Sequence, residues 1–223
     1  ADLKYGVDGP WTAYTEYATK YSGTNTTEPV VSVKGGKQWL YGGLRMGGKS
    51  YYALDLSNVT SVSGTPKLKF KIDPIVAPAN SPLSYMGQSW SKPTIAWVNW
   101  KGTRKLVMLV GGGYDPIYEN IGTPTSSSKD FGAGVYMFDA DDGSLLWWAS
   151  SHAAANKETE TNVPNMKRSV VSQIKAIDRN TDGLVDHLYF GDLGGQVWRV
   201  DLDDAKTAGG TTNIAKRVTR ILD

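Results

Sequence analysis

The sequence predicts an all-β fold of the β-propeller class. Eight Trp, 12 Tyr and 25 Gly occur in 223 residues; aromatic residues favour strands, and glycines favour the turns between them. Twelve short stretches have strand character, and no long helical periodicity interrupts them. A weak repeat, in which a glycine precedes an aromatic-rich strand that ends in aspartate, occurs three times. Such repeats are typical of propeller blades, which contain four strands each.

The expected strands follow one another between turns rich in glycine and aspartate. Alternation of apolar and polar residues is clearest near Val135 and Gln196, and it places successive side chains on opposite faces of a strand. The segment Ala153–Thr161 is the best helix candidate, but it lacks an apolar stripe and we expect a polar loop. The predicted strands are Trp11–Ala18, Gln38–Tyr41, Ser50–Leu56, Lys67–Ile72, Thr94–Val98, Lys105–Val110, Val135–Asp139, Leu145–Trp148, Gln173–Ile177, His187–Phe190, Gln196–Leu202 and Ala215–Leu222.

The repeat sets the expected number of blades. Its three copies are Gly48–Asp55, Gly134–Asp139 and Gly195–Asp201. Twelve strands make about three blades, whereas closed propellers typically have about 4–8. We therefore expect residues 1–223 to form a portion of a single β-propeller domain, with a partial or truncated set of blades.

Composition excludes several classes of function. The 24 Lys and Arg against 22 Asp and Glu leave a net charge of +2 without any basic run, which argues against nucleic acid or an anionic membrane as the main partner. The absence of cysteine excludes disulfides, thiol catalysis and Cys-based zinc sites. No signal segment opens the chain, so we expect a mature product or an excised internal piece.

One motif match is misleading. The stretch Gly43–Ser50 fits the phosphate-binding pattern G-x4-G-K-S. A P-loop needs a helix directly after it, because the helix N-terminus holds the phosphates. Here an alternating, strand-like run follows up to Asp55. The sequence therefore predicts a glycine-rich hairpin turn and no nucleotide site.

The stretch 178–186 carries the strongest chemical signal. Oxygen-bearing side chains occupy its positions 1, 3, 5 and 9, and glycine occupies position 6, as in the front of a calcium-binding loop. A backbone carbonyl serves at position 7 of such loops. Three carboxylates and one amide suit a hard dication that takes oxygen ligands. The predicted calcium (Ca²⁺) ligands are Asp178, Asn180, Asp182, Asp186 and the carbonyl of Leu184.

This loop departs from the EF-hand at its end. Tyr189 stands where the EF-hand has its bidentate glutamate, so Asp186 must close the site. The flanking segments Gln173–Ile177 and His187–Phe190 have strand character, and we expect the loop to join the two strands of a hairpin. The alternative is an Asp- and Asn-rich β-turn without metal.

Enzyme interpretations lack the necessary residues. The two histidines, His152 and His187, are 35 residues apart, have no paired carboxylate signature and are expected to be solvated. The carboxylates Asp141 and Asp142 are expected to be solvated in a hairpin turn. Neither G-x-S-x-G nor H-E-x-x-H occurs. We therefore expect that the chain is not an enzyme and has no catalytic residues.

Tryptophans allow two interpretations. Trp97, Trp100, Trp147 and Trp148 can stack on sugars or form an interface when exposed. In a protein built of blades, the same large apolar rings pack one blade against the next. We expect this packing role.

The segment Ser172–Leu202, which contains the predicted calcium loop, resembles the signature of the PilC/PilY family of type IV pilus assembly and tip-associated adhesin proteins. Other stretches agree with this resemblance in the family's order, and together they extend it from about Val7 to Leu202. They are Tyr41–Asp55, Met86–Ile95, Val110–Tyr114 and Val135–Gly143.

The resemblance implies a bacterial surface protein whose domain is a modified β-propeller similar to quinoprotein folds. It would be secreted across the inner membrane and act at the pilus tip or outer membrane, with any membrane association made through the wider protein. It would support pilus extension against retraction, surface attachment and twitching motility, with calcium in the 178–186 loop. Its expected partners are pilin or minor pilins and a host surface receptor.

Two alternatives remain open. A calcium-stabilised carbohydrate- or host-receptor-binding propeller module would use calcium only as a structural element. A quinoprotein-like dehydrogenase would place calcium beside a quinone cofactor and would need a general base, for which the sequence offers no residue set. Within the favoured function, calcium is either a permanent structural ion or a regulatory one.

Overall fold

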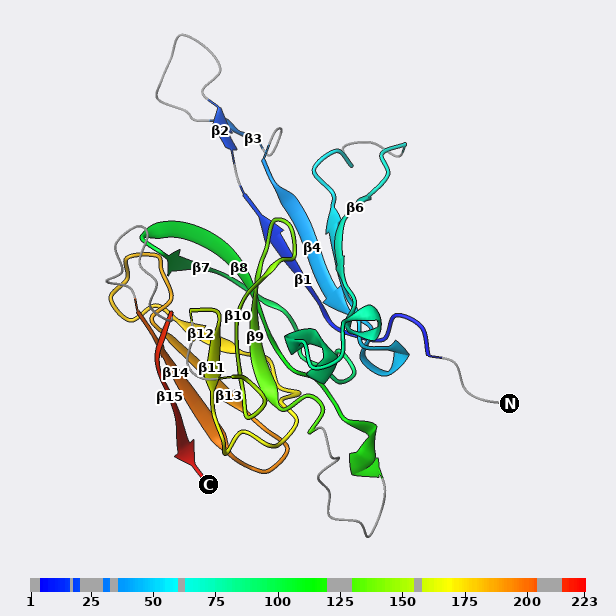
Figure 1. The fold of residues 1–223 in the computed structure, drawn as a ribbon. Coiled ribbons are helices and arrows are strands. Elements are labelled where there is room, and N and C mark those ends of the chain that lie inside the picture. The colour runs from blue at the N-terminus through cyan, green and yellow to red at the C-terminus, as the bar shows by residue number, and fades with distance from the viewer. Residues whose placement is uncertain are drawn as a thin grey trace.

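The computed structural model describes residues 5–16, 18–20, 30–32, 36–59, 63–119, 130–154, 158–203 and 214–223. These residues form three main sheets of mostly antiparallel strands, which we call blades 1, 2 and 3 in chain order (Figure 1). No helix among them is long and apolar enough to cross a lipid bilayer. The all-β prediction and the estimate of about three blades are confirmed for the described residues.

Blade 1 has the strand order β1-β4-β5-β6. Burial alternates along part of these strands, because Trp39, Tyr41, Tyr51 and Ala53 are buried and the intervening Leu40 and Tyr52 are less so, as in a sheet with one face against a core. Every neighbouring pair is antiparallel. The strands are β1 (Trp11–Thr15), β4 (Gln38–Gly43), β5 (Tyr51–Asp55) and β6 (Lys67–Ile72).

Blade 2 has five strands in the order β11-β10-β9-β8-β7. The outermost strand, β11, lies parallel to β10, and the other pairs are antiparallel. The strands are β7 (Thr94–Trp100), β8 (Thr103–Gly111), β9 (Gly134–Asp139), β10 (Leu145–Ser150) and β11 (Glu160–Asn162).

Blade 3 has the order β12-β13-β14-β15 and is antiparallel throughout. Its last strand is the edge of the sheet and leads to the C-terminal residue Asp223. The strands are β12 (Lys175–Ile177), β13 (His187–Gly191), β14 (Val197–Leu202) and β15 (Ala215–Leu222).

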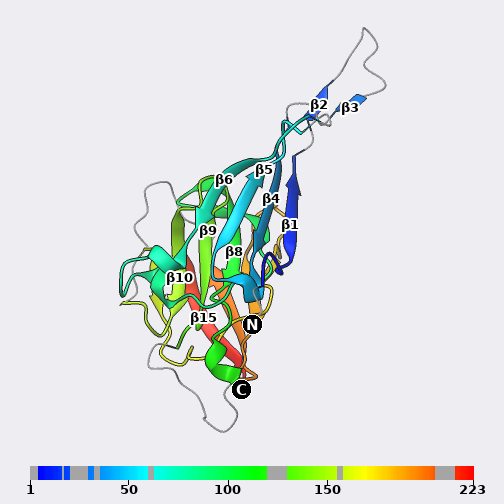
Figure 2. The same ribbon diagram turned by 90° about the vertical axis from the view of Figure 1, so that its right-hand side faces the viewer.

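Smaller elements lie outside the blades. A two-stranded ribbon of β2 (Ala18–Lys20) and β3 (Val30–Ser32) extends away from blade 1 in both views (Figures 1 and 2). Four short 3-10 helices lie in the connections. They are η1 (Arg45–Gly47), η2 (Pro74–Val76), η3 (Pro82–Tyr85) and η4 (Pro116–Glu119).

The first strands of the three blades lie next to one another. β7 contacts both β1 and β12. The Thr12 hydroxyl donates to the Pro93 carbonyl at 2.6 Å, and the Thr94 hydroxyl donates to the Ile174 carbonyl at 2.7 Å. The three copies of the sequence repeat fall on β5, β9 and β14, the third strand of each blade counted from this inner side. The blades are therefore equivalent units around a common axis, as in a propeller.

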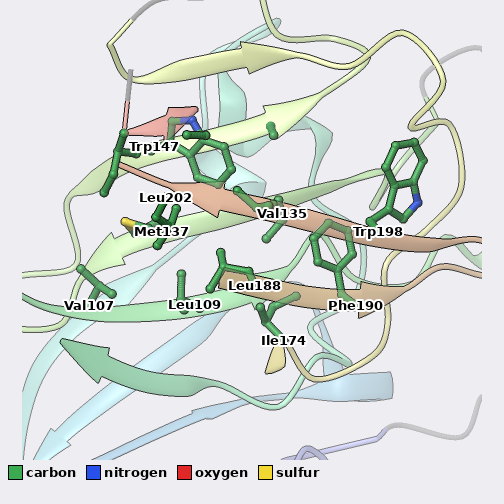
Figure 3. Packing of buried hydrophobic residues seen from close by; sticks show 14 of the residues in the cluster. Val107, Leu109, Val135, Met137, Trp147, Ile174, Leu188, Phe190, Trp198 and Leu202 are labelled. Carbon is green, nitrogen blue, oxygen red and sulfur yellow. The ribbon is translucent and has the colours of Figure 1, made fainter. Parts of the chain in front are cut away.

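Two hydrophobic cores lie between neighbouring blades. The first core lies between blades 1 and 2, and the second lies between blades 2 and 3 (Figure 3). Blade 2 is buried on both faces, because Val107 and Leu109 of β8 enter the second core while Met108 and Val110 enter the first. This burial explains the unbroken apolar run Leu106–Val110 in the sequence, because a sheet covered on both sides has no polar face.

The structure contains one strand that was not predicted, β3 (Val30–Ser32), and it corrects the strand prediction at two further places. Within Ala153–Thr161, the expected polar loop already contains the start of β11 at Glu160, which pairs with Trp148. Near the N-terminus, the predicted strand Trp11–Ala18 is divided, because β1 ends at Thr15 and β2 begins at Ala18. Both differences concern three-residue strands, which are too short to show a periodicity of their own.

Candidate metal centre

The predicted calcium loop joins two paired strands, as expected from the sequence. β12 ends at Ile177 and β13 begins at His187, and these two residues are opposite each other in the antiparallel pair. The backbone N–H of Asp186 donates to the carbonyl of Ile177 at 2.9 Å and closes the base of the loop. The 178–186 loop is therefore a hairpin connection at one end of blade 3.

Side-chain oxygens hold the front of the loop by accepting backbone N–H groups. The two carboxylate oxygens of Asp178 accept from Thr181 at 2.7 Å and from Gly183 at 2.8 Å. Asp182 accepts from the N–H of Leu184 at 2.8 Å. Thr181 and Gly183 have φ angles of 63° and 84°, and glycine adopts this left-handed conformation without strain. The glycine at position 6 thus makes the sharp turn that the motif requires.

The end of the loop is held by Asp186. Its Oδ2 accepts from the backbone N–H of Arg179 at 2.5 Å and from that of Asn180 at 3.3 Å. The side-chain oxygen of Asn180 in turn accepts from the N–H of Asp182 at 3.0 Å. Asp186 is 8% exposed, whereas Asn180 and Asp182 are exposed. The last predicted ligand therefore lies beneath the loop, and the others lie around its rim.

The loop is also attached to blade 2. The N–H of Val185 donates to the carbonyl of Trp97 on β7 at 2.9 Å, and the Val185 side chain is buried in the second core. The guanidinium of Arg104 on β8 lies 4.6 Å from the centre of the Trp97 ring and is the group nearest to Gly183. A change in loop conformation would therefore act directly on the contact between blades 2 and 3.

The donor set suits calcium in its chemistry. Carboxylate, amide and carbonyl oxygens are the ligands that this hard cation takes. The arrangement in the structure is closed by hydrogen bonds within the loop. Among the residues that the structure describes, no three Asp, Glu or His side chains gather into a metal-binding cluster. Like-charged carboxylates repel one another, so a cation would have to draw Asp178, Asp182 and Asp186 together.

The phosphate-loop match forms no nucleotide site. β4 and β5 pair antiparallel, with Gly43 opposite Tyr51, and the short helix η1 connects them. Gly43 and Ser89 are in close contact, because a Cβ at Gly43 would lie 2.5 Å from the Ser89 carbonyl oxygen. The prediction of a glycine-rich hairpin turn is confirmed.

The prediction that both histidines are solvated is wrong. His152 stacks on Tyr85 with ring centres 4.2 Å apart, and its Nε2 lies 3.9 Å from Asp130 Oδ2. His187 Nδ1 lies 2.9 Å from Asp201 Oδ1, and its side chain is 15% exposed. Each imidazole therefore has a carboxylate neighbour supplied by a distant part of the chain.

Asp201 is the centre of a charged cluster that the sequence analysis missed. Arg199 Nε donates to its Oδ1 at 2.6 Å, and Arg217 donates to its Oδ2 from Nε at 2.8 Å and from a terminal nitrogen at 2.6 Å. Burial acts to raise the pKa of Asp201, but the two guanidinium groups outweigh it and hold the pKa below its ordinary value. The turn Gly194–Gly195 was the available signal, because a hairpin folded there places His187 opposite Asp201.

The tryptophans pack the blades together, as predicted. Trp147 and Trp148 are adjacent on β10 and are buried in opposite cores, at 0% and 3% exposure. Trp100 packs against the second core and Trp97 against the first. Trp147 and Trp148 are therefore not available to stack on a sugar.

Three blades of antiparallel strands around adjacent first strands define a β-propeller protein. The chain belongs to the PilY1 β-propeller domain family, whose model matches residues 14–219. The resemblance drawn from the sequence is thereby confirmed.

Relatives and a solved structure agree with this family. The type IV pilus biogenesis factors PilY1 of Pseudomonas aeruginosa strains PAO1 and PAK are each 29% identical over 163 residues, which is 73% of this chain. This stretch spans 11% of the length of either relative. The crystal structure of the Pseudomonas aeruginosa PilY1 C-terminal domain superposes with a TM-score of 0.56 at 24% identity, covering 87% of this chain and 30% of the other. This structural likeness supports the fold.

Proposed function

We propose that this chain is part of the propeller domain of a type IV pilus biogenesis factor at the bacterial cell surface. The family match over residues 14–219 is the observation that carries the proposal. The name of the curated relatives, type IV pilus biogenesis factor, supports the same assignment. In the intact protein, the domain would act at the pilus tip or outer membrane, support pilus extension against retraction, and promote surface attachment and twitching motility. Its partners would be pilin or minor pilins and a host surface receptor, and its role would be non-enzymatic.

Calcium binding by the 178–186 loop is the second part of the proposal. Asp178, Asn180, Asp182 and Asp186 would supply side-chain oxygens, and Leu184 its carbonyl. Support comes from the oxygen register, the left-handed Gly183 at the turn position and the position of the loop on a strand hairpin. A bound cation would neutralise the clustered carboxylates.

The attachment of the loop to β7 suggests what this ion would do. The hydrogen bond from Val185 to Trp97 links the loop to blade 2. A loop held by calcium would therefore fix the docking of blade 3, and a calcium-free loop would leave it more mobile. We propose that this difference opposes pilus retraction in the calcium-loaded state, so that calcium regulates the domain as well as stabilising it.

The binding test is calorimetry on the chain after treatment with a chelator. We expect stoichiometric binding of Ca²⁺ to the unmodified protein, and a loss of about tenfold or more in Asp182→Ala. Saturation at about 100 times Kd should raise the free energy of unfolding by about 2.7 kcal/mol, measured by thermal melting. Absence of both the heat and the stabilisation would refute the calcium site.

Asp142→Ala is a matched control for this test. Asp142, in the β9–β10 turn, accepts the N–H of Ser144 at 2.8 Å, as Asp182 accepts that of Leu184. Both carboxylates are exposed and both hold a turn. Asp142→Ala should leave calcium binding unchanged. Equal loss in the two variants would mean that general acidity attracts the ion.

The cellular test places the same two substitutions in the intact protein. Asp182→Ala should change piliation or twitching motility without loss of the protein, and Asp142→Ala should not. A variant that loses calcium but retains normal piliation and twitching would rule out regulation by calcium. Quinone absorbance in the purified protein would instead favour the dehydrogenase alternative.

A further inference from the structure

Blade 3 contains an open pocket of about 480 Å³ at the base of the 178–186 loop. It lies on the face of the sheet that points away from the second core, because His187, Arg199 and Asp201 alternate with the core residues Leu188 and Val200. The remaining charged lining residues are Arg179, Asp186 and Lys216.

The carboxylates of the pocket are already engaged. Asp201 accepts hydrogen bonds from both Arg199 and Arg217. The carboxylate of Asp186 accepts two backbone N–H groups of the loop. The charge of Asp201 is therefore matched by its two guanidinium partners, whereas Asp186 keeps its negative charge and pairs with no cationic side chain that the structure describes.

Cationic side chains outnumber carboxylates in the pocket. Arg179 forms no side-chain hydrogen bond or ion pair with any other residue that the structure describes, so all five of its guanidinium N–H donors are available. Lys216 pairs with Asp203 at 3.3 Å, and the two guanidiniums at Asp201 share one carboxylate. Among the residues that line the pocket, three cationic side chains, Arg179, Arg199 and Lys216, thus stand against two carboxylates, Asp186 and Asp201. An additional single negative charge would balance this set.

The neighbouring edge strand, β15, is also rich in basic residues. β15 pairs only with β14, so its outer edge is free among the described strands. Its exposed residues beside the pocket include Lys216 and Arg217. Charged residues protect a sheet edge against pairing with other strands, and they also attract an acidic segment in extended conformation.

We propose that the pocket of blade 3 binds a side-chain carboxylate from an acidic segment of a partner protein. The planar guanidinium of Arg179 matches a carboxylate through paired N–H donors. A dianionic phosphate suits the pocket less well, because Asp186 and Asp201 line it and repel the second charge. The open mouth accommodates a residue that remains part of a polypeptide.

The pocket and the calcium loop share Asp186. This part of the inference rests on the proposed function: a calcium ion at Asp186 would neutralise one of the two acids in the pocket. Carboxylate binding should then strengthen, and by linkage carboxylate binding should strengthen calcium binding by the same factor. A coupling of about fivefold is expected, the lower end of the usual range.

The test uses two short probes in chelator, observed by NMR shifts of the chain. These are the capped peptides Ac-Gly-Glu-Gly-NH2 and Ac-Gly-Gln-Gly-NH2. The glutamate peptide should bind and the glutamine peptide should not. Arg179→Gln should weaken binding by about tenfold, the cost of one charge-assisted hydrogen bond. Arg220→Gln removes the same charge from β15 at a residue that pairs with Asp223 outside the pocket, and it should have no such effect.

Each other outcome decides a different point. No binding of the glutamate peptide, or equal weakening in both arginine variants, would overturn the pocket. Tighter binding of inorganic phosphate than of the peptide would overturn the assignment to a carboxylate. Peptide binding that calcium does not change would overturn the coupling alone. Absence of calcium binding would overturn the proposed metal site and leave the pocket in place.

Discussion

The two cores of this protein are built from different side chains. The first core is aromatic: Tyr41, Tyr51 and Tyr136 are almost fully buried, and each hydroxyl donates to a distant backbone carbonyl at 2.7–3.0 Å. The second core contains no buried tyrosine among the described residues and consists mainly of valine, leucine and methionine, with Trp147 and Trp198. Aliphatic contacts are not directional, whereas hydrogen bonds require a defined geometry. Blade 1 is thus oriented by its side chains, and blade 3 needs other restraints.

Those restraints are hydrogen bonds at the inner edge of blade 3. Ser91 and Thr94 donate their hydroxyls to the carbonyls of Ser172 and Ile174, both at 2.7 Å. The Val185 N–H bond to Trp97 lies within the proposed calcium loop. An ion in that loop would therefore act on the interface between blades 2 and 3, whose core has fewer directional contacts than the core between blades 1 and 2.

The largest expected effect is alkaline unfolding that starts at the first core. Burial raises the pKa of Tyr41, Tyr51 and Tyr136 well above the ordinary value. Their contribution to stability is therefore present below about pH 10, the pKa of the unfolded state, and is lost as pH rises above it. Above that pH, each of the three tyrosines should lower the free energy of unfolding by about 1.4 kcal/mol per pH unit.

Absorbance titration of phenolate and hydrogen exchange would measure this loss. The three tyrosines should ionise only with unfolding, and protection should fail in β4, β5 and β9 before it fails in β13. Titration of all 12 tyrosines near pH 10 in a folded protein would contradict the burial of the three hydroxyls.

Substitution of the adjacent tryptophans of β10 allows the contributions of the two cores to stability to be compared. Trp147→Ala opens the second core and Trp148→Ala the first, and each should cost about 3–5 kcal/mol in urea unfolding. Trp147→Ala also removes the hydrogen bond from Nε1 to the Thr161 hydroxyl, which is 3.0 Å long. Only Trp147→Ala should lower hydrogen-exchange protection in β13 and β14 selectively. Equal effects on both outer blades would show that the two cores act as one unit.

The smallest effect concerns one hydroxyl group. Tyr51→Phe should cost about 1–1.5 kcal/mol, because it removes a buried hydrogen bond and leaves the Ser91 carbonyl without that donor. Met137→Leu, a volume-conserving change in the second core, should cost less than about 1.5 kcal/mol. Chemical denaturation measures both. A neutral Tyr51→Phe would mean that shape alone orients blade 1.

Much of the fold could be predicted from short-range patterns. The alternation in Gln196–Leu202 appears as alternate burial in β14, and the repeated glycine–strand–aspartate units are the third strands of the blades. The turn at Gly43–Ser50 could be separated from a P-loop because a strand pattern follows it. β11 could not be predicted, because its three residues show no strand pattern of their own and form a strand only by pairing in parallel with β10.

The candidate site could also be predicted only in part. The oxygen register of residues 178–186 is a property of consecutive residues, and the hairpin on either side of it was expected. The sequence did not indicate that Val185 would attach the loop to β7 or that Asp186 would also line a pocket. Both relations join a residue of the loop to strands that are paired or docked only in the folded protein.

The sequence by itself therefore determined most of the strands, the turns, the approximate number of blades and the spacing of oxygen-bearing side chains in residues 178–186. All of these depend on neighbouring residues and on the twofold period of a strand. Only the tertiary structure decided that Trp147 and Trp148 enter different cores, and that Arg199 and Arg217 share Asp201. These arrangements depend on strand register and on the docking of one blade against the next, which bring together residues that are distant in the chain.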